Sequence, residues 1–195
     1  MITAGHSGRI ELARTGLDDP DAEVHAAALG ALARLGALKV ADIARALGSG
    51  PVPVRRRATD AALAVRGPGS RSALPALLVD ALSDPDPLVV VGAAWYLSER
   101  RVAAAVAPLA DLARSHEDVR CREACVAALG AIGDRRGLDS VIAALDDKPT
   151  VRRRATVALA GFDDPRVEAA LQRSADDKDW QVRQAADELL DNDNE

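Results

Sequence analysis

The sequence predicts an all-α fold, a right-handed α-α superhelix of about five to six helix pairs, on three observations. The hexapeptide Val-Arg-Arg-Arg-Ala-Thr occurs twice, starting at Val54 and at Val151, 97 residues apart. Weaker copies of the pattern recur at intervals of 30 to 35 residues. The sequence has no alternating runs of aromatic or β-branched residues of the kind that form strands. Self-similarity at this period indicates a repeat architecture.

Each repeat opens with a helix, here called the first helix, whose apolar residues recur every four positions. The leading position is filled by Val24, Val54, Val89, Cys121, Val151 and Val182. Four residues later every repeat carries alanine or cysteine, and eight residues later leucine or alanine. Apolar residues at this spacing predict one buried helix face.

Most first helices are followed by a turn rich in glycine, proline or aspartate, and a second helix comes after that turn. An acidic or turn-forming segment then leads into the next repeat. The second helices are expected near residues 40–47, 74–82, 106–112, 138–145 and 167–171. Asp and Pro in the acidic segments suit the start of a helix. We expect one domain over residues 1–195, with single helical caps at 7–17 and 180–191 and a polar tail at 191–195.

The first helices carry a family resemblance. The segments DDPDAEVHAAALGAL (18–32) and DDKPTVRRRATVALA (146–160) resemble the short HEAT-like repeat of phycobilin lyases and many bacterial proteins, and ALPALLVDAL (73–82) resembles its second helix. The resemblance extends over residues 7–190. It implies stacked helix pairs, and it implies little about function because this repeat serves many unrelated roles.

Composition and charge restrict the function classes. The chain carries 25 basic and 30 acidic residues, a net charge of −5, which argues against nucleic acid as the main partner. The sequence has no secretory apolar region and no apolar run long enough to span a membrane, so no membrane partner is expected. Two cysteines do not make a disulfide framework, and a cytoplasmic location is the simplest expectation.

Arginine follows the leading apolar residue in four of the six repeats, at Arg55, Arg122, Arg152 and Arg183. Aspartates precede the helices at the same end, one repeat away in a stacked array. Because a guanidinium pairs with a carboxylate through two hydrogen bonds, we expect a ladder of ion pairs between repeats. Later arginines of each run are expected to face solvent. A patch for phosphate or an acidic partner is the alternative interpretation.

Metal, cofactor and catalytic sites are not expected, although the chain is not excluded as an enzyme. Cys121 and Cys125 lie in the apolar columns, where buried packing explains them better than redox chemistry or zinc. His116-Glu117 is the single His-Glu pair, whereas the di-iron site of the HEAT-like deoxyhypusine hydroxylases resembles a set of several such pairs. One histidine and one carboxylate leave a dinuclear site short of ligands, so a capping loop is the preferred interpretation.

The third repeat departs from the pattern. Val90 replaces the ladder arginine, and Val91 and Trp95 stand where most other repeats have polar residues. We predict a protein-binding site of Val91, Trp95, Tyr96, Arg100 and Arg101, an apolar patch rimmed by arginine. The alternative interpretation is that the segment 66–72 folds over this patch. Trp180 is expected to pack as a staple at the start of the last helix.

A non-catalytic protein-protein interaction scaffold or adaptor is the function that the sequence favours. Its partner is expected to be another protein, with a homodimer through the third repeat as a further option. A bilin-lyase-like enzyme or chaperone is the alternative, suggested by the family resemblance. A second alternative is a DNA-binding protein similar to the HEAT-like DNA glycosylases.

Overall fold

The computed structural model describes residues 2–67 and 69–192, with only the backbone described for 2–7 and 192. These described residues form α-helices and short 3₁₀ turns and contain no β-strand, which confirms the predicted all-α repeat fold. The chain divides into two compact units, residues 1–96 and 97–195. The single-domain expectation stays a prediction, and each unit is described by itself.

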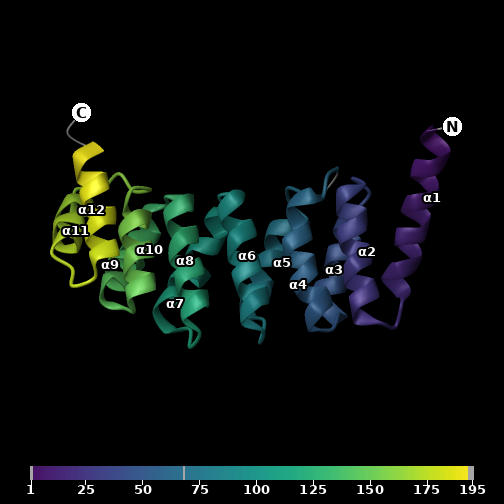
Figure 1. Cartoon of the computed structure of the whole chain (residues 1–195), viewed down its shortest axis with the longest axis horizontal. Coiled ribbons are helices and arrows are strands. Elements are labelled where there is room, and N and C mark those ends of the chain that lie inside the picture. Colours follow the sequence, from purple (N-terminus) through teal and green to yellow (C-terminus); the bar gives the residue numbers. More distant parts are fainter. Residues whose placement is uncertain (1, 68, 193–195) are drawn as a thin grey trace. The chain divides into compact units, whose positions relative to one another are not determined.

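Unit 1 consists of helices that alternate between the two types predicted. In chain order they are α1 (Ile2–Thr15), α2 (Ala22–Arg34), α3 (Val40–Ser49), α4 (Val52–Ala61), α5 (Ala73–Asp80) and most of α6 (Pro87–Glu99). The first helices are α2, α4 and α6, and the second helices are α1, α3 and α5 (Figure 1). The predicted cap at 7–17 corresponds to α1 and the 3₁₀ turn Gly16–Asp18.

Unit 2 continues the same alternation. Its helices are α7 (Val106–Ser115), α8 (Val119–Ile132), α9 (Leu138–Ala143), α10 (Pro149–Leu159), α11 (Arg166–Ala175) and α12 (Trp180–Asn192). The first helices α8, α10 and α12 pack in succession, and the second helices α9 and α11 pack beside them. The predicted cap at 180–191 is α12. Residues 193–195 of the predicted polar tail lie outside the described residues.

The leading apolar column is buried in five of the six repeats, as the periodicity predicts. The exposed fraction is at most 1% for Val54, Val89, Cys121, Val151 and Val182. Val24 of α2 departs from this pattern, because 43% of its surface is exposed. On that side of α2, among the described residues, lie α1 and the 3₁₀ turn Gly16–Asp18, whereas α4, α10 and α12 each pack against a preceding first helix.

Helix starts follow the predicted capping chemistry. The Asp21 side chain accepts a hydrogen bond from the Glu23 N–H at 2.8 Å, and the Asp118 side chain accepts one from the Arg120 N–H at 2.8 Å. Trp180 does not act as the predicted staple, because 62% of its surface is exposed. It begins α12 on the side away from the apolar core.

Two glycines set the closest approaches between first helices. A Cβ atom on Gly92 of α6 would lie 2.2 Å from the Thr59 hydroxyl oxygen of α4. A Cβ on Gly130 of α8 would lie 2.6 Å from the Ala158 Cβ and 2.7 Å from the Ala158 Cα of α10. Real Cβ atoms essentially never approach other non-hydrogen atoms so closely. Glycine at these positions therefore permits the observed helix spacing.

The predicted ladder of ion pairs is confirmed for Arg55, Arg122 and Arg152 but not for Arg183, and we call it the arginine ladder. Its ladder pairs are Arg55–Asp84, Arg122–Asp147 and Arg152–Asp177. In each pair the arginine Nε and Nη2 donate to both carboxylate oxygens, at 2.6 to 2.9 Å. The arginine lies on a first helix, and the aspartate follows the second helix of the same repeat. Each pair thus fixes one helix pair against the next turn.

The later arginines divide between two environments. Arg153 is exposed, as expected, and Arg154 is exposed but also pairs with Glu123 of α8 at 3.2 Å. Arg56 is not simply solvent-facing, because its guanidinium pairs with both carboxylate oxygens of Asp86, at 2.8 and 2.6 Å. The sequence analysis did not predict this second pair. Asp84 and Asp86 both lie in the segment before α6, and only one aspartate of that segment was expected to pair with an arginine.

The ladder predicts acid sensitivity. Hydrogen bonds from Arg122 and Arg152 lower the pKa of Asp147 and Asp177, respectively. A carboxyl group whose pKa is lowered by folding stabilises the folded state above its unfolded pKa, about 3.9 for aspartate. This stabilisation is lost as the pH falls through the folded pKa. We expect the urea concentration at the unfolding midpoint to decrease once the pH is lowered below about 4. The decrease should be smaller in Arg152→Ala, which lacks one ladder pair. An acid response unaltered by that substitution would contradict the assignment.

Candidate functional site

An exposed apolar stripe runs along α6, formed by Leu88, Val91 and Trp95. Leu88 is 39% and Trp95 47% exposed, and Val91 is partly exposed. Their spacing of three and four residues places them on one side of the helix. The positions equivalent to Trp95 in other repeats are Gly30, Asp60, Ala127, Val157 and Glu188. The sequence identified Val91 and Trp95 and missed Leu88, although its position one turn earlier was a usable signal.

Tyr96 does not belong to the stripe, and this part of the predicted site is corrected. Its side chain is fully buried. One residue along a helix turns the side chain by about 100°, so a residue next to an exposed one lies on a different face. Tyr96 occupies the column that holds Ala61 in α4 and Ala158 in α10, both buried. It therefore fills the core with a larger ring.

Arg100 and Arg101 follow the end of α6 and are exposed, in unit 2. Arg101 has a φ of 46°, in the left-handed region that arginine rarely adopts. The equivalent position after α2 and after α8 is glycine, Gly36 and Gly133, with φ of 66° and 69°. Arginine thus stands where the helix end favours glycine, at a cost of about 1 kcal/mol.

The alternative interpretation placed the segment 66–72 over the stripe. Gly69 of this segment lies beside the Val40 side chain of α3, and 47% of the Trp95 surface is exposed. Pro68 lies outside the described residues. The described part of the segment therefore gives no support to internal cover.

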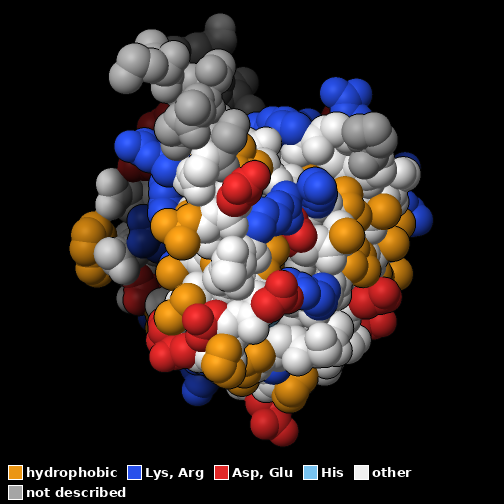
Figure 2. Space-filling model, turned by 90° about the vertical axis from the view of Figure 1, so that its right-hand side faces the viewer, with side chains coloured by type: hydrophobic (Ala, Val, Ile, Leu, Met, Phe, Trp, Pro, Cys, Tyr) orange, Lys and Arg blue, Asp and Glu red, His pale blue; other side chains and the backbone are white. Residues whose placement is uncertain are grey.

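A groove between α1 and α2, which the sequence did not predict, is a second candidate site. It encloses about 630 Å³. Its apolar walls come from the residues Leu12, Ala13, Val24, Ala27, Ala28, Ala31 and Leu35. Leu12 is 75% exposed. Figure 2 looks onto this end of unit 1, where apolar side chains lie among charged ones.

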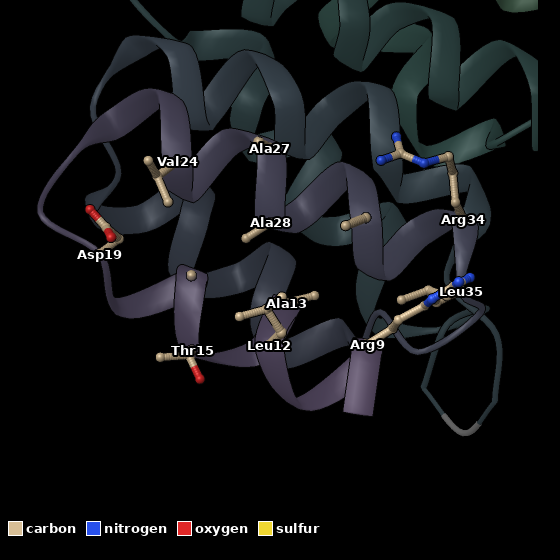
Figure 3. A pocket seen from close by; sticks show the side chains of 12 residues that line it. Arg9, Leu12, Ala13, Thr15, Asp19, Val24, Ala27, Ala28, Arg34 and Leu35 are labelled. Carbon is tan, nitrogen blue, oxygen red and sulfur yellow. The ribbon is translucent and has the colours of Figure 1, made fainter. Parts of the chain in front are cut away.

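The groove has charge of opposite sign at its two ends. Asp19 lies at one end, and Arg9 and Arg34 lie at the other (Figure 3). None of these three side chains forms an ion pair with a described residue. The neighbouring Asp18 does form one, with Arg45 of α3 at 2.7 Å. The groove therefore combines an apolar centre with unpaired charges.

The predicted metal and redox candidates have ordinary structural surroundings. Cys121 and Cys125 are buried thiols, and burial together with Cys121 raises the pKa of Cys125 to about 12. The ring Nδ1 of His116 accepts a hydrogen bond from the Asp118 N–H at 3.0 Å, as in a capping loop. In the described ranges, no three His, Cys, Asp or Glu side chains gather closely enough to hold a metal ion.

The repeat pattern and the helix pairs define an α-helical repeat protein. A model of HEAT repeats matches residues 74–158 and 138–191, together more than half of the chain. The chain belongs to the HEAT-repeat proteins. None of the curated proteins matches the sequence. Among the described residues, no helix has the length and apolar character that crossing a bilayer requires.

Solved structures show the same fold at low sequence identity. An engineered protein is 20% identical with a TM-score of 0.70, covering 94% of this chain and 97% of its own. The complex of CpcE and CpcF of phycocyanin lyase from Nostoc sp. PCC7120 is 22% identical with a TM-score of 0.66, and the match covers 91% of this chain and 74% of the other. Human deoxyhypusine hydroxylase is 19% identical with a TM-score of 0.52, and the match covers 93% of this chain and 83% of the other. At these identities the similarity describes the fold alone.

Proposed function

We propose that this chain is a non-catalytic interaction module that binds another protein through the α6 stripe of Leu88, Val91 and Trp95. The observation that carries the proposal is the exposure of Trp95 on a helix whose neighbouring residues are mostly apolar and buried. Val89, Val90, Ala93 and Ala94 of the same helix are fully buried. They anchor α6 in the core, so binding has to order the exposed side chains of the stripe but not the helix that carries them.

Tryptophan is the residue type most often found to dominate binding at protein interfaces. A large ring set beside smaller apolar side chains buries much area with few rotatable bonds. The stripe differs from the polar surface at the same position of α4, where Arg56 pairs with Asp86. A second copy of the chain is one partner that fits the proposal. The bilin-lyase and DNA-binding alternatives gain no specific contact from the described residues.

We expect Trp95→Ala to weaken partner binding by about 2 kcal/mol or more, roughly 30-fold in Kd. The measurement is affinity enrichment from the native source, followed by titration of the enriched partner with purified variants. Trp180→Ala is the matched control, because Trp180 is a similarly exposed tryptophan on a different helix, α12. Equal retention by the wild type, the control and Trp95→Ala would remove the stripe from the function.

A further inference from the structure

We propose that copies of this chain associate head to tail, with α12 of one copy seated in the α1–α2 groove of the next. The contact completes one more ladder pair, between Arg183 of the first copy and Asp19 of the second. This inference uses surfaces other than the α6 stripe and does not depend on the proposed function.

The ladder pairs supply the pattern. In each one, the arginine Nη1 donates to a carbonyl oxygen of the turn before its own helix, and its Nε and Nη2 bind the carboxylate. Nη1 of Arg152, for example, donates to the Asp147 carbonyl at 3.0 Å. The carboxylate in turn accepts the N–H two residues later in two of these pairs, as Asp177 accepts the Asp179 N–H at 2.7 Å. These features define both halves of a ladder pair.

Arg183 on α12 has the geometry of a ladder arginine without its carboxylate. Its Nη1 donates to the Asp177 carbonyl oxygen at 2.8 Å, matching the Nη1 bond of Arg152. It forms no ion pair with any described residue. The Nε and Nη2 edge, which binds aspartate in the complete pairs, is therefore available to an external carboxylate.

Asp19 has the geometry of a ladder aspartate without its arginine. It lies five residues before Val24, as Asp84 and Asp177 lie five residues before the leading residues of α6 and α12. Asp19 accepts the Asp21 N–H at 2.9 Å, the same turn that Asp84 makes with Asp86 at 2.8 Å. It lines the groove and pairs with no described arginine.

The helices beside these residues are complementary in type. Within the described chain, α1 is a second helix with no first helix packed before it, and α12 is a first helix with no second helix after it. Val24 and Ala27 on α2 are exposed where α12 would pack. Asp187 of α12 is exposed, whereas the equivalent residue is buried in the five preceding first helices: Leu29, Thr59, Ala94, Val126 and Thr156. Seating α12 in the groove would restore one helix pair.

The charges favour one orientation of α12. First helices pack parallel to one another, so the start of α12 would lie at the Asp19 end of the groove (Figure 3). Arg183 is near that start, and the exposed Asp187 and Asp191 lie toward the basic end. Acidic side chains on α12 replace part of the usual apolar contact. The association is therefore weak, salt-sensitive and concentration-dependent.

Because the two surfaces differ, the contact is heterologous and leaves a free head and tail on each pair of copies. Sedimentation velocity tests it directly. The weight-average mass of the wild-type chain rises between micromolar and millimolar concentration and falls with added salt. Arg183→Asp and Asp19→Arg each raise the dissociation constant by more than about tenfold. Leu12→Glu does the same from the exposed centre of the groove, without altering the Asp19 turn.

The decisive measurement mixes the two charge-reversed variants. Each alone associates more than about tenfold more weakly than the wild type, and an equimolar mixture recovers association. In the mixture, residue 183 on α12 of one variant meets an oppositely charged residue 19 in the groove of the other. Asp163→Arg, a charge reversal in another exposed turn, leaves wild-type association unchanged. A chain that is monomeric at every concentration overturns the inference. So does self-association that is unchanged by Arg183→Asp, Asp19→Arg and Leu12→Glu, and its loss in Trp95→Ala would then assign it to the third repeat.

Discussion

Replacing Arg152 by alanine is expected to lower the free energy of unfolding by about 3 kcal/mol or more. Arg152 and Asp177 are only 7% and 13% exposed at their side chains, so water replaces little of the lost interaction. The substitution leaves the Asp177 carboxylate buried without its cation and the Asp147 carbonyl without its donor. Chemical denaturation monitored by circular dichroism measures the loss.

The next residue supplies the control for this prediction. Arg153 is exposed and forms no ion pair with a described residue, so Arg153→Ala is expected to change stability by less than about 0.5 kcal/mol. The double variant Arg152→Met/Asp177→Leu should recover much of the lost stability, because apolar residues of similar size often replace a buried ion pair without penalty. Equal losses in Arg152→Ala and Arg153→Ala would show that the ladder pair contributes nothing specific.

The substitution Gly130→Ala is expected to cost about 3 kcal/mol through overpacking between α8 and α10. Its Cβ would meet the Cβ and Cα of Ala158, at 2.6 and 2.7 Å, and the Ala158 carbonyl oxygen at 2.8 Å. Two of these three atoms are backbone, which yields only if the whole helix moves. The thermal unfolding midpoint gives the first readout, and denaturant titration gives the free energy.

Gly48→Ala tests whether the cost comes from crowding. Gly48 also lies in a helix, α3, but its added Cβ would meet no atom within 4 Å. Alanine is favoured over glycine in a helix by about 0.5–1 kcal/mol, so this variant should be slightly stabilised. A Gly130→Ala protein as stable as Gly48→Ala would contradict the close approach of α8 and α10.

The repeat period and the apolar columns were sufficient to predict the helix pairs. The first helices bury nearly all residues at the leading position and at four and eight residues after it, and this requirement recurs from repeat to repeat whatever the surface residues are. The ladder was predictable for the same reason. Arginine and aspartate recur at fixed places relative to the buried columns, so stacking brings them together in three of the six repeats. The Arg56–Asp86 ion pair was not predicted, because Asp86 lies in the same segment as the ladder residue Asp84.

The candidate sites were only partly predictable. Val91 and Trp95 break a pattern, and a break is visible in sequence. Tyr96 was misassigned because a single helical position decides between surface and core, and sequence spacing does not fix the helix rotation that finely. The α1–α2 groove gave no motif at all. It arises because Val24 obeys the column rule while no first helix among the described residues packs over it, and the lack of such a contact leaves no trace in the residue itself.

The sequence by itself determined the helices, their pairing, the buried columns and the positions of the ladder residues, because these depend on local periodicity repeated along the chain. Only the tertiary structure decided which ladder residues lack a partner, which face of α6 is exposed and where α2 is uncovered. These depend on what packs against each surface, a relation between distant segments. Asp19 and Arg183 look like every other ladder residue in sequence and differ only in having no counterpart in the described fold.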